Sequence, residues 1–376
     1  MRQIVNTRFS AVLQEFSQAM RKGEFVLEKE IHNDQDSSFI PDVTFHPTQS
    51  IFAVSYRDND EVRLYDINSQ QVIRKYANPQ AQLSYPHGAL LTENHLIVTN
   101  KLGERGIEPS KLTVYRIDSE SCEPVTVFTT PANHLREAHS LDIRSGKLLV
   151  TYCGKNTGGI LTYDFNDDTG EITGPISCLE DWFSGYGEPK GICFSEDGTK
   201  VFVTLASKTL PKELEEAACD SSRSASVQNI KSSLRKVVPS ILNKDQKSTQ
   251  GNHHFNGLVE FDIDSTGTLS KEPVRILPQP NSRLENIHIV RGLCVVADPI
   301  NDSVYLYNMQ DDAVFEKPAQ VLTDTLSFPH SASISPDRSQ LVVTNYGIER
   351  KPNGYPAWSK FRTPRNDKLT IYKALL

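Results

Sequence analysis

The sequence predicts an all-β chain folded as a six-bladed β-propeller, with seven blades as the alternative. Three observations predict it. A short alternating strand with an aromatic residue at a fixed place recurs six times, two further strands precede each copy, and a fourth strand follows five of them. Four antiparallel strands in a unit of about 45–50 residues are typical of a propeller blade.

The recurring strand is rich in β-branched and aromatic residues and alternates with a period of two, which is the pattern of a half-buried strand. Its copies are residues 62–67, 112–117, 160–165, 258–263, 304–309 and 369–374. The strands immediately upstream are residues 51–54, 96–99, 148–151, 201–204, 294–297 and 341–344. The fourth strands are residues 72–76, 125–129, 176–179, 274–277 and 319–322.

The sixth copy ends at the C-terminus, so its fourth strand is missing. We expect residues 25–30 to supply that strand and close the ring, which leaves no bare sheet edge. Residues 8–22 have the apolar spacing of an amphipathic helix. The predicted organisation is therefore a lead-in over residues 1–24 and a single propeller domain over 25–376.

The long gap in blade 4 is where a seventh blade could lie. The first residues of successive units are 45, 52, 51, 95 and 45 residues apart. Residues 207–253 nevertheless have helical spacing and loop composition, and blade 4 needs residues 258–263 as its own third strand. We therefore interpret 207–253 as a helical insert and count six blades.

Composition indicates a soluble cytoplasmic protein. The net charge of −7 argues against a nucleic-acid binder, and no apolar run approaches the length of a membrane span. The first residues lack an apolar signal-peptide core, and the six cysteines form no C-x-x-C pair.

Two phrases in the last unit, residues 329–337 and 341–347, carry a resemblance to a known superfamily. The chain resembles the lactonase-like β-propellers, including the 6-phosphogluconolactonases with YVTN-type repeats, over most of residues 39–376. The resemblance implies a hydrolase that acts on a small substrate. Such propellers usually have seven blades, so a count of six is a departure from the family.

Each predicted inner strand begins with an ionisable residue. These residues are Asp42, His87, His139, Lys190, Glu285 and His330. Because the first residue of each inner strand points into the central channel, we expect the six side chains to converge at one mouth. Ionisable groups are costly to bury unless they are paired, ligated or used. The alternative is that each simply forms a hydrogen bond to the neighbouring blade.

The loops that leave the second strands overhang the same mouth. They and the strand ends supply the predicted substrate-binding residues, which are Arg57, Lys101, Tyr152, Asn345, Arg350 and Arg362. The loops at 223–247 and 349–367 carry net positive charge, which favours an anionic small-molecule substrate. The segment 227–242 could instead bind a protein partner.

Two mechanisms fit this set of residues. In the first, Glu285 or a neutral histidine (His87 or His139) is the general base, and Lys190 with an arginine stabilises an oxyanion. In the second, His87, His139 and His330 with Glu285 or Asp42 bind a divalent metal ion. Blades 2, 3 and 6 are not all adjacent, which argues against a compact three-histidine site.

We therefore expect an enzyme that acts on a small anionic substrate by general acid–base or metal-assisted hydrolysis of a lactone or ester. An isomerase, lyase or cyclase on the same scaffold is one alternative, because fold does not fix reaction. A non-catalytic propeller that binds a protein partner is the other.

Overall fold

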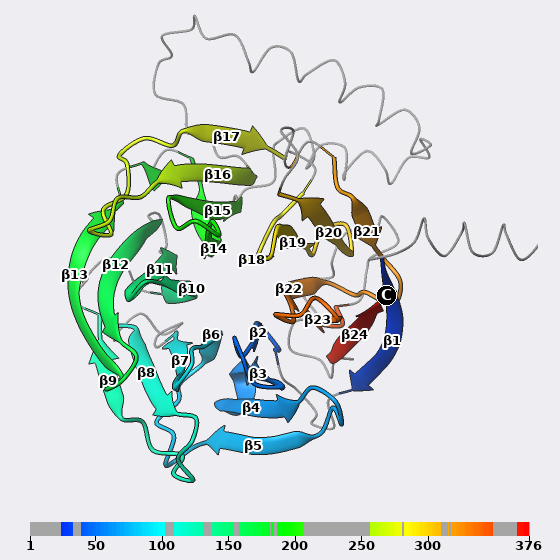
Figure 1. Ribbon diagram of the computed structural model, residues 1–376, viewed down its shortest axis with the longest axis horizontal. Helices are drawn as coiled ribbons and strands as arrows, with labels where there is room; N and C mark the ends of the chain where they lie inside the picture. Colours follow the sequence, from blue (N-terminus) through cyan, green and yellow to red (C-terminus); the bar gives the residue numbers. More distant parts are fainter. Residues whose placement is uncertain are drawn as a thin grey trace, which may run out of the picture.

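Six four-stranded antiparallel sheets form a ring around a central axis in the computed structural model (Figure 1). The structure describes residues 24–32, 39–101, 109–130, 137–153, 158–180, 182–183, 186–206, 256–279, 282–309, 315, 317–348 and 367–375. Within these residues the predicted count of six blades is confirmed, and no seventh sheet is present.

Blades 1 to 3 follow one another along the chain, each running from the axis outward. Blade 1 consists of β2 (Val43–Phe45), β3 (Ile51–Tyr56), β4 (Glu61–Asp66) and β5 (Val72–Ala77), with the short 3-10 turn η1 (Arg57–Asn59) after β3. Blade 2 consists of β6 (Pro86–Leu91), β7 (His95–Asn100), β8 (Lys111–Arg116) and β9 (Thr126–Thr129). Blade 3 consists of β10 (Glu137–Arg144), β11 (Lys147–Cys153), β12 (Gly158–Asn166) and β13 (Glu171–Leu179).

Blades 4 and 5 repeat this order, and blade 6 joins the two ends of the chain. Blade 4 consists of β14 (Glu188–Phe194), β15 (Lys200–Ala206), β16 (Gly257–Asp262) and β17 (Arg275–Pro278). Blade 5 consists of β18 (Ile287–Val290), β19 (Leu293–Asp298), β20 (Ser303–Asn308) and β21 (Gln320–Leu322). Blade 6 consists of β22 (Pro329–Ile334), β23 (Gln340–Asn345), β24 (Lys368–Ala374) and β1 (Phe25–His32).

The predicted closure of the ring by the N-terminal strand is confirmed. β1 pairs antiparallel with β24 from Phe25 opposite Ala374 to His32 opposite Lys368. The side-chain amide of Gln320 in blade 5 also bonds both backbone groups of Phe25, at 2.9 and 2.7 Å. The outer edge of blade 6 is therefore covered by a strand that lies more than 300 residues away in sequence.

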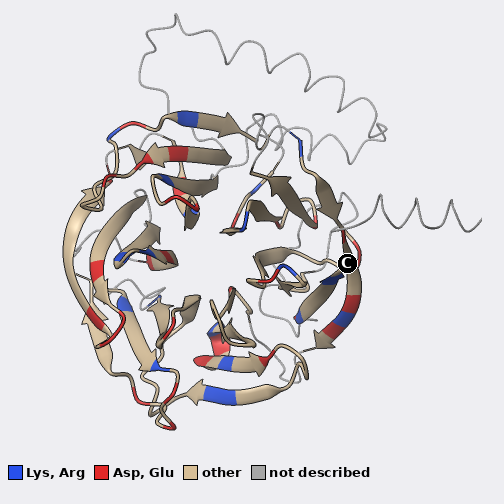
Figure 2. Cartoon of the chain, viewed as in Figure 1, with Lys and Arg blue, Asp and Glu red and all other residues tan. Residues whose placement is uncertain are grey.

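The predicted helices lie outside the described residues, both the one over 8–22 and the insert over 207–253. In the described part of the chain, η1 is the only helical element. None of the helical structure described there has the length and apolar character that a membrane crossing requires. Acidic and basic residues are interspersed over the described blades rather than sorted to one side (Figure 2).

The hydrophobic core is divided into six layers, one between each pair of neighbouring blades. Between blades 3 and 4, for example, Leu149 and Ile160 pack with Val201 and Phe261. Corresponding clusters fill the other five junctions. The ionisable residues that begin the inner strands belong to none of these clusters.

Hydroxyl groups on the second strands link neighbouring blades close to the axis. Each donates a hydrogen bond to the main-chain carbonyl of a predicted channel residue in the next blade. These hydroxyl bridges are Ser55 to His87 (2.6 Å), Thr99 to His139 (3.2 Å), Thr151 to Lys190 (2.7 Å) and Thr204 to Glu285 (2.9 Å).

The register between the first and second strands shifts where four of the channel residues lie. The shifts fall at Pro86/Ala89, Ala138/Leu141, Pro189/Ile192 and Pro329/Ser331. A bulge of this kind re-aims a side chain and leaves a backbone group outside the ladder. The freed N–H groups of Gly88, Ser140 and Gly191 donate to the same threonine hydroxyls that form the bridges.

The inner strands of blades 4 and 5 approach so closely that only glycine fits between them. A Cβ on Gly191 would lie 2.7 Å from the Glu285 carbonyl oxygen and 2.7 Å from the Ile287 nitrogen. Real Cβ atoms do not approach backbone atoms to this distance. The absence of a side chain at Gly191 therefore permits Lys190 and Glu285 to lie side by side.

Thr204→Val is expected to lower the free energy of unfolding by about 1–3 kcal/mol. Valine matches the shape of threonine but leaves the Gly191 N–H and the Glu285 carbonyl without their buried partner. Urea unfolding provides the measurement, with Thr129→Val on the exposed outer strand β9 as the control. Equal losses in the two variants would show that the hydroxyl bridge does not stabilise the ring.

Candidate functional site

Three histidines from three different blades meet at one end of the channel. His87, His139 and His330 are all buried, and one ring nitrogen from each lies within 4.8 Å of the others. The ring centroids of His87 and His139 are 4.0 Å apart, and His330 lies 5.2 Å from His87. The expectation that non-adjacent blades prevent a compact cluster is wrong, because the inner strands lie close enough to the axis for side chains to meet across it.

Glu285 completes the cluster from blade 5. Its Oε2 atom lies 3.8 Å from His139 Nε2 and 3.7 Å from His330 Nε2, and it accepts no hydrogen bond within the described residues. Its other oxygen, Oε1, accepts a hydrogen bond of 2.7 Å from Arg283 Nε. One oxygen is therefore fixed by an arginine, and the other faces the histidines.

Hydrogen bonds to the backbone set the tautomers of two histidines. His330 Nδ1 lies 2.7 Å from the Pro41 carbonyl oxygen, and His87 Nδ1 lies 3.2 Å from that of His139. A carbonyl only accepts, so Nδ1 carries the proton in both rings. In the neutral imidazole the Nε2 atom is then a bare lone pair, as a metal ligand requires.

Burial keeps the three imidazoles neutral at pH 7. Burial is the main reason that the pKa of His330 falls to about 4, although Glu285 opposes the shift. Burial, with the positive charge of Lys101 adding to it, lowers the pKa of His87 well below its usual range. The pKa of His139 is lowered in the same way, first by burial and then by His87.

Glu285 remains ionised in the same surroundings. Burial alone would raise its pKa, but Arg283, Lys190 and His330 together lower it to about 2. A carboxylate that is this acidic accepts protons poorly at neutral pH. Its position suits a permanent negative charge better than it suits a general base.

Lys190 is a buried cation beside the cluster. Its Nζ atom lies 3.2 Å from Glu188 Oε2 and 3.6 Å from Cys153 Sγ. Burial works to lower the pKa of Lys190, but Cys153, Glu285 and Glu188 raise it overall. Burial raises the pKa of Cys153 to about 11, so its thiol stays protonated and is a poor nucleophile.

Asp42 does not belong to the cluster, which corrects its prediction as a metal ligand. Its two carboxylate oxygens accept four hydrogen bonds, from Val43 N (3.0 Å), Ala89 N (2.9 Å), Asn286 Nδ2 (3.0 Å) and Ser331 Oγ (2.6 Å). Burial raises its pKa to about 7 against these bonds. Since Asn286 and Ser331 directly follow Glu285 and His330, Asp42 positions the cluster rather than contributing to it.

Arg57 and Lys101 lie near enough to the cluster for their charges to act on it. The Arg57 guanidinium stacks 3.8 Å above the Phe39 ring, and Lys101 lies 3.7 Å from Glu137. Both positive charges act on the pKa of His87. The other basic candidates, Arg350 and Arg362, lie outside the described residues.

Tyr152 and Asn345 do not line the mouth, and their prediction as substrate-binding residues is wrong. The Tyr152 hydroxyl is fully buried 2.9 Å from that of Tyr163, within the core between blades 2 and 3. Asn345 is also fully buried, where it accepts from Ser327 N at 3.0 Å and donates to Thr370 Oγ1 at 3.0 Å. Tyr152 packs between two blades, and Asn345 links strands within blade 6.

One contributor to the site, Arg283, escaped prediction from the sequence. Arg283 binds Glu285 but precedes it by two residues, in the connection before the inner strand. Tyr346 stacks on His330 with ring centroids 4.5 Å apart. The signal for the bridging threonines was present, since Thr99, Thr151 and Thr204 occupy equivalent places in three repeats.

The space enclosed by the cluster is small. A cavity of about 10 Å³ is bounded by Pro41, Asp42, His87, His139, Ser140, Glu285, Asn286 and His330. This volume admits one water molecule or one ion, but no organic molecule. A substrate would therefore have to approach the cluster from the mouth of the channel rather than enter this cavity.

Fold and site together define the chain as a six-bladed β-propeller with a buried cluster of three histidines and one carboxylate. No protein-family model matches the sequence, and no curated protein matches it either.

Solved structures resemble the chain in fold. A luciferin-regenerating enzyme aligns with a TM-score of 0.56 and 11% identity, over 93% of this chain and 96% of its own. The hydrazine synthase of Kuenenia stuttgartiensis aligns with a TM-score of 0.48 and 13% identity, over 85% of this chain and 96% of its own. At such identities, the first likeness shows the propeller fold alone.

Acid is expected to destabilise the metal-free protein through His330. Because its pKa falls from 6.5 to about 4 on folding, the unfolded chain takes up a proton first as pH drops. Stability is therefore lost between pH 6.5 and 4. His330→Gln should flatten this dependence by up to about 1.4 kcal/mol per pH unit.

Urea unfolding between pH 7 and 4, with a chelator present, measures this effect. His32→Gln is the control, since its side chain is 52% exposed. Parallel pH profiles for the wild type and both variants would contradict the burial of a neutral imidazole at position 330.

Proposed function

We propose that the chain is an enzyme that acts on a small anionic substrate at the mouth of the channel, using a divalent metal ion held by His87, His139, His330 and Glu285. Hydrolysis of a lactone or ester is the proposed reaction. The observation that supports a metal ion is that two hydrogen-bond acceptors, Glu285 Oε2 and His330 Nε2, face each other in the cluster, and Oε2 accepts no hydrogen bond from a described residue.

Glu285 Oε2 and His330 Nε2 are two acceptors that cannot form a hydrogen bond with each other. The first is an ionised oxygen, the second is a lone pair in the neutral tautomer, and they are 3.7 Å apart. Two buried acceptors repel unless a cation or a proton donor lies between them. The low pKa of His330 disfavours an imidazolium, so a metal ion is the better candidate.

The donor set fits a first-row transition metal. Imidazole nitrogen with carboxylate oxygen suits zinc or iron, and the ligands are already deprotonated at pH 7. The backbone carbonyls that fix the tautomers of His87 and His330 supply the outer interactions that such ligands normally have. The enclosed space accommodates one ion.

A bound metal would supply Lewis acidity, polarising a carbonyl or activating a water molecule. The residues around it have separate roles. Arg283 holds Glu285 in orientation through a 2.7 Å hydrogen bond. Lys190, which remains protonated, is placed to stabilise negative charge that develops on the substrate. The alternative in which Glu285 is the general base is disfavoured by its pKa of about 2.

Four cationic side chains support an anionic substrate. They are Arg57, Lys101, Lys190 and Arg283, contributed from blades 1, 2, 4 and 5. Their charges act on the ionisation of the cluster itself, on His87 for the first three and on Glu285 for Arg283. Positive charge above a buried metal site attracts a carboxylate or phosphate and orients it.

The choice of lactone or ester hydrolysis rests on the resemblance to lactonase-like propellers. The same site could serve an isomerase, lyase or cyclase, since fold does not fix the reaction. The segment 227–242, which a partner-binding propeller would use, lies outside the described residues.

Purified protein is expected to bind one equivalent of Zn²⁺ per chain after chelation and reloading. His139→Ala and His330→Ala should each weaken binding at least tenfold, because each removes one ligand from a cluster that has no described substitute. Equilibrium dialysis with elemental analysis measures this. His32→Ala is the matched control, and equal Zn²⁺ affinity in all four proteins would discard the metal.

Activity is expected to depend on the charge of Glu285 and not only on its shape. Glu285→Gln should lower kcat at least a hundredfold on the best substrate from a panel of carboxylated and phosphorylated γ- and δ-lactones. Glu123→Gln, on an exposed turn, is the control. A folded E285Q variant with wild-type kcat would overturn the proposed site, and no turnover across the panel would overturn lactone hydrolysis.

A further inference from the structure

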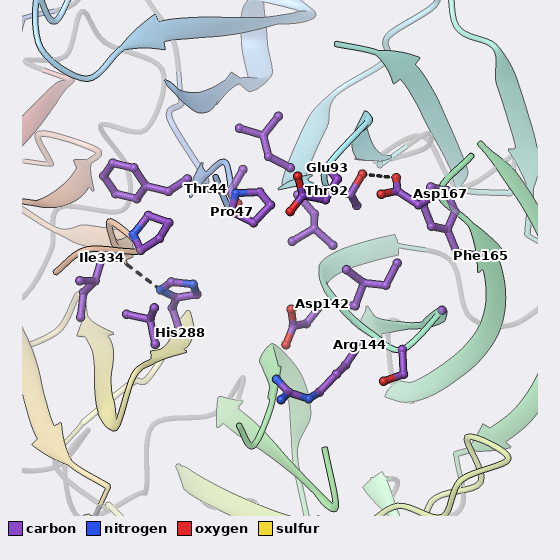
Figure 3. Close-up of a pocket in the computed structure, with 18 of the residues that line it drawn as sticks. Thr44, Pro47, Thr92, Glu93, Asp142, Arg144, Phe165, Asp167, His288 and Ile334 are labelled. Atoms are coloured by element: carbon purple, nitrogen blue, oxygen red, sulfur yellow. Dashed lines mark hydrogen bonds between the residues drawn. The ribbon is translucent and has the colours of Figure 1, made fainter. Parts of the chain in front are cut away.

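A second, much larger cavity lies at the opposite end of the channel. Its volume is about 580 Å³, against about 10 Å³ for the space at the histidines. Residues near the far ends of β2, β6, β10, β18 and β22 form its walls (Figure 3). Pockets of 300–1,000 Å³ are the size that proteins use to hold small organic ligands.

A polar layer separates this lower cavity from the histidine cluster. Asp42, Ser140 and Asn286 bound the small space, and Asp42 and Asn286 are hydrogen-bonded across the axis at 3.0 Å. Two residues further along the same strands, Thr44, Asp142 and His288 bound the lower cavity. The two spaces share the axis of the propeller but are lined by different side chains.

Asp142 places a negative charge in the wall of the lower cavity. Its carboxylate accepts from Phe194 N at 2.7 Å and from Ile143 N at 2.9 Å, which leaves further lone pairs available. Burial raises its pKa to about 6, so the group is mostly ionised at pH 7. No salt bridge to Asp142 is formed within the described residues.

His288 and Thr44 add hydrogen-bonding groups from two other blades. The backbone N–H of Ile334 donates to His288 Nδ1 at 3.3 Å, so the neutral ring carries its proton on Nε2. In Figure 3 the side chains of Asp142 and His288 face the same open space from opposite walls. Burial lowers the pKa of His288 to about 4, which keeps the ring neutral.

The remaining wall is mixed, with apolar side chains and with the charged residues Glu93, Asp167 and Arg291. Phe45, Leu90, Ile143, Val290 and Ile334 line the cavity around the polar groups. Arg144 also borders it, but this exposed side chain extends over Gly198, where a Cβ would lie 3.0 Å from its Cδ and Nε atoms. Of the other acids, Glu93 accepts a hydrogen bond from Thr48 Oγ1 and Asp167 accepts one from Thr92 Oγ1. Asp142 accepts only backbone hydrogen bonds within the described residues, so it is the acidic group that we expect to meet a ligand inside.

We propose that the lower cavity is a second binding site, for a small organic amine with an apolar body and an oxygen acceptor. The ammonium group binds the Asp142 carboxylate as a charge-assisted hydrogen bond. The His288 Nε2–H donates to the ligand oxygen, and the apolar body packs on Leu90, Ile143 and Val290. This site is independent of the metal site and of the reaction proposed there.

Tyramine is the probe, because it combines an ammonium group, a ring and a hydroxyl oxygen. Its affinity is measured by isothermal titration alongside 3-(4-hydroxyphenyl)propionate, which has a similar body and the opposite charge. Tyramine is expected to bind at least tenfold more tightly than the carboxylate. Asp142→Asn should reduce tyramine affinity at least tenfold, in keeping with the loss of a charge-assisted bond.

Two further variants keep the test decisive. Ile143→Trp fills the cavity without removing a polar group and should abolish binding, whereas His139→Ala at the other mouth should leave tyramine affinity unchanged. The proposal is overturned if tyramine does not bind at millimolar concentration or if the carboxylate binds equally well. It is also overturned if D142N and I143W both retain wild-type affinity, or if H139A loses it.

Discussion

The close approach of the inner strands at the axis is the constraint on which the site depends. Hydroxyl bridges from Ser55, Thr99, Thr151 and Thr204 fasten the carbonyls of four of the six channel residues to the preceding blade. At Gly191 the neighbouring backbone leaves no room even for a Cβ. Because the backbone is held this tightly, side chains from blades 2, 3, 5 and 6 meet even though these blades do not form one continuous run.

The close packing of these buried ionisable side chains lowers the stability of the fold when nothing is bound to them. Three neutral imidazoles and an ionised carboxylate lie together in a space that water barely enters, and one carboxylate oxygen has no described donor. Buried acceptors without partners destabilise a protein, and apolar residues would fill the same space at lower cost. The cation proposed for this cluster would relieve that cost, with Asp42, Arg283 and Lys190 holding the geometry around it.

The features of this protein that repeat along the chain could be predicted from sequence. The directions in which individual side chains point could not. Strand periodicity located the blades and the closing strand, since β1 observed at Phe25–His32 matches the predicted 25–30. The channel residues followed because each occupies the same place in its repeat. Tyr152 and Asn345 were predicted to line the mouth because they lie at strand ends. Position at a strand end does not reveal whether a side chain points to the channel or into the core. Arg283 precedes Glu285 by only two residues, but it lies before the inner strand and outside the repeated pattern. The lower cavity depends on contacts between distant segments, which a single sequence does not encode in any visible spacing.

A crystal grown with Zn²⁺, with diffraction data collected on both sides of the zinc absorption edge, tests the central claim most directly. The account predicts one strong anomalous peak on the channel axis, about 2.0–2.2 Å from a nitrogen of each of His87, His139 and His330 and from a Glu285 oxygen. A map with no peak there, or with zinc only at other positions, would contradict it.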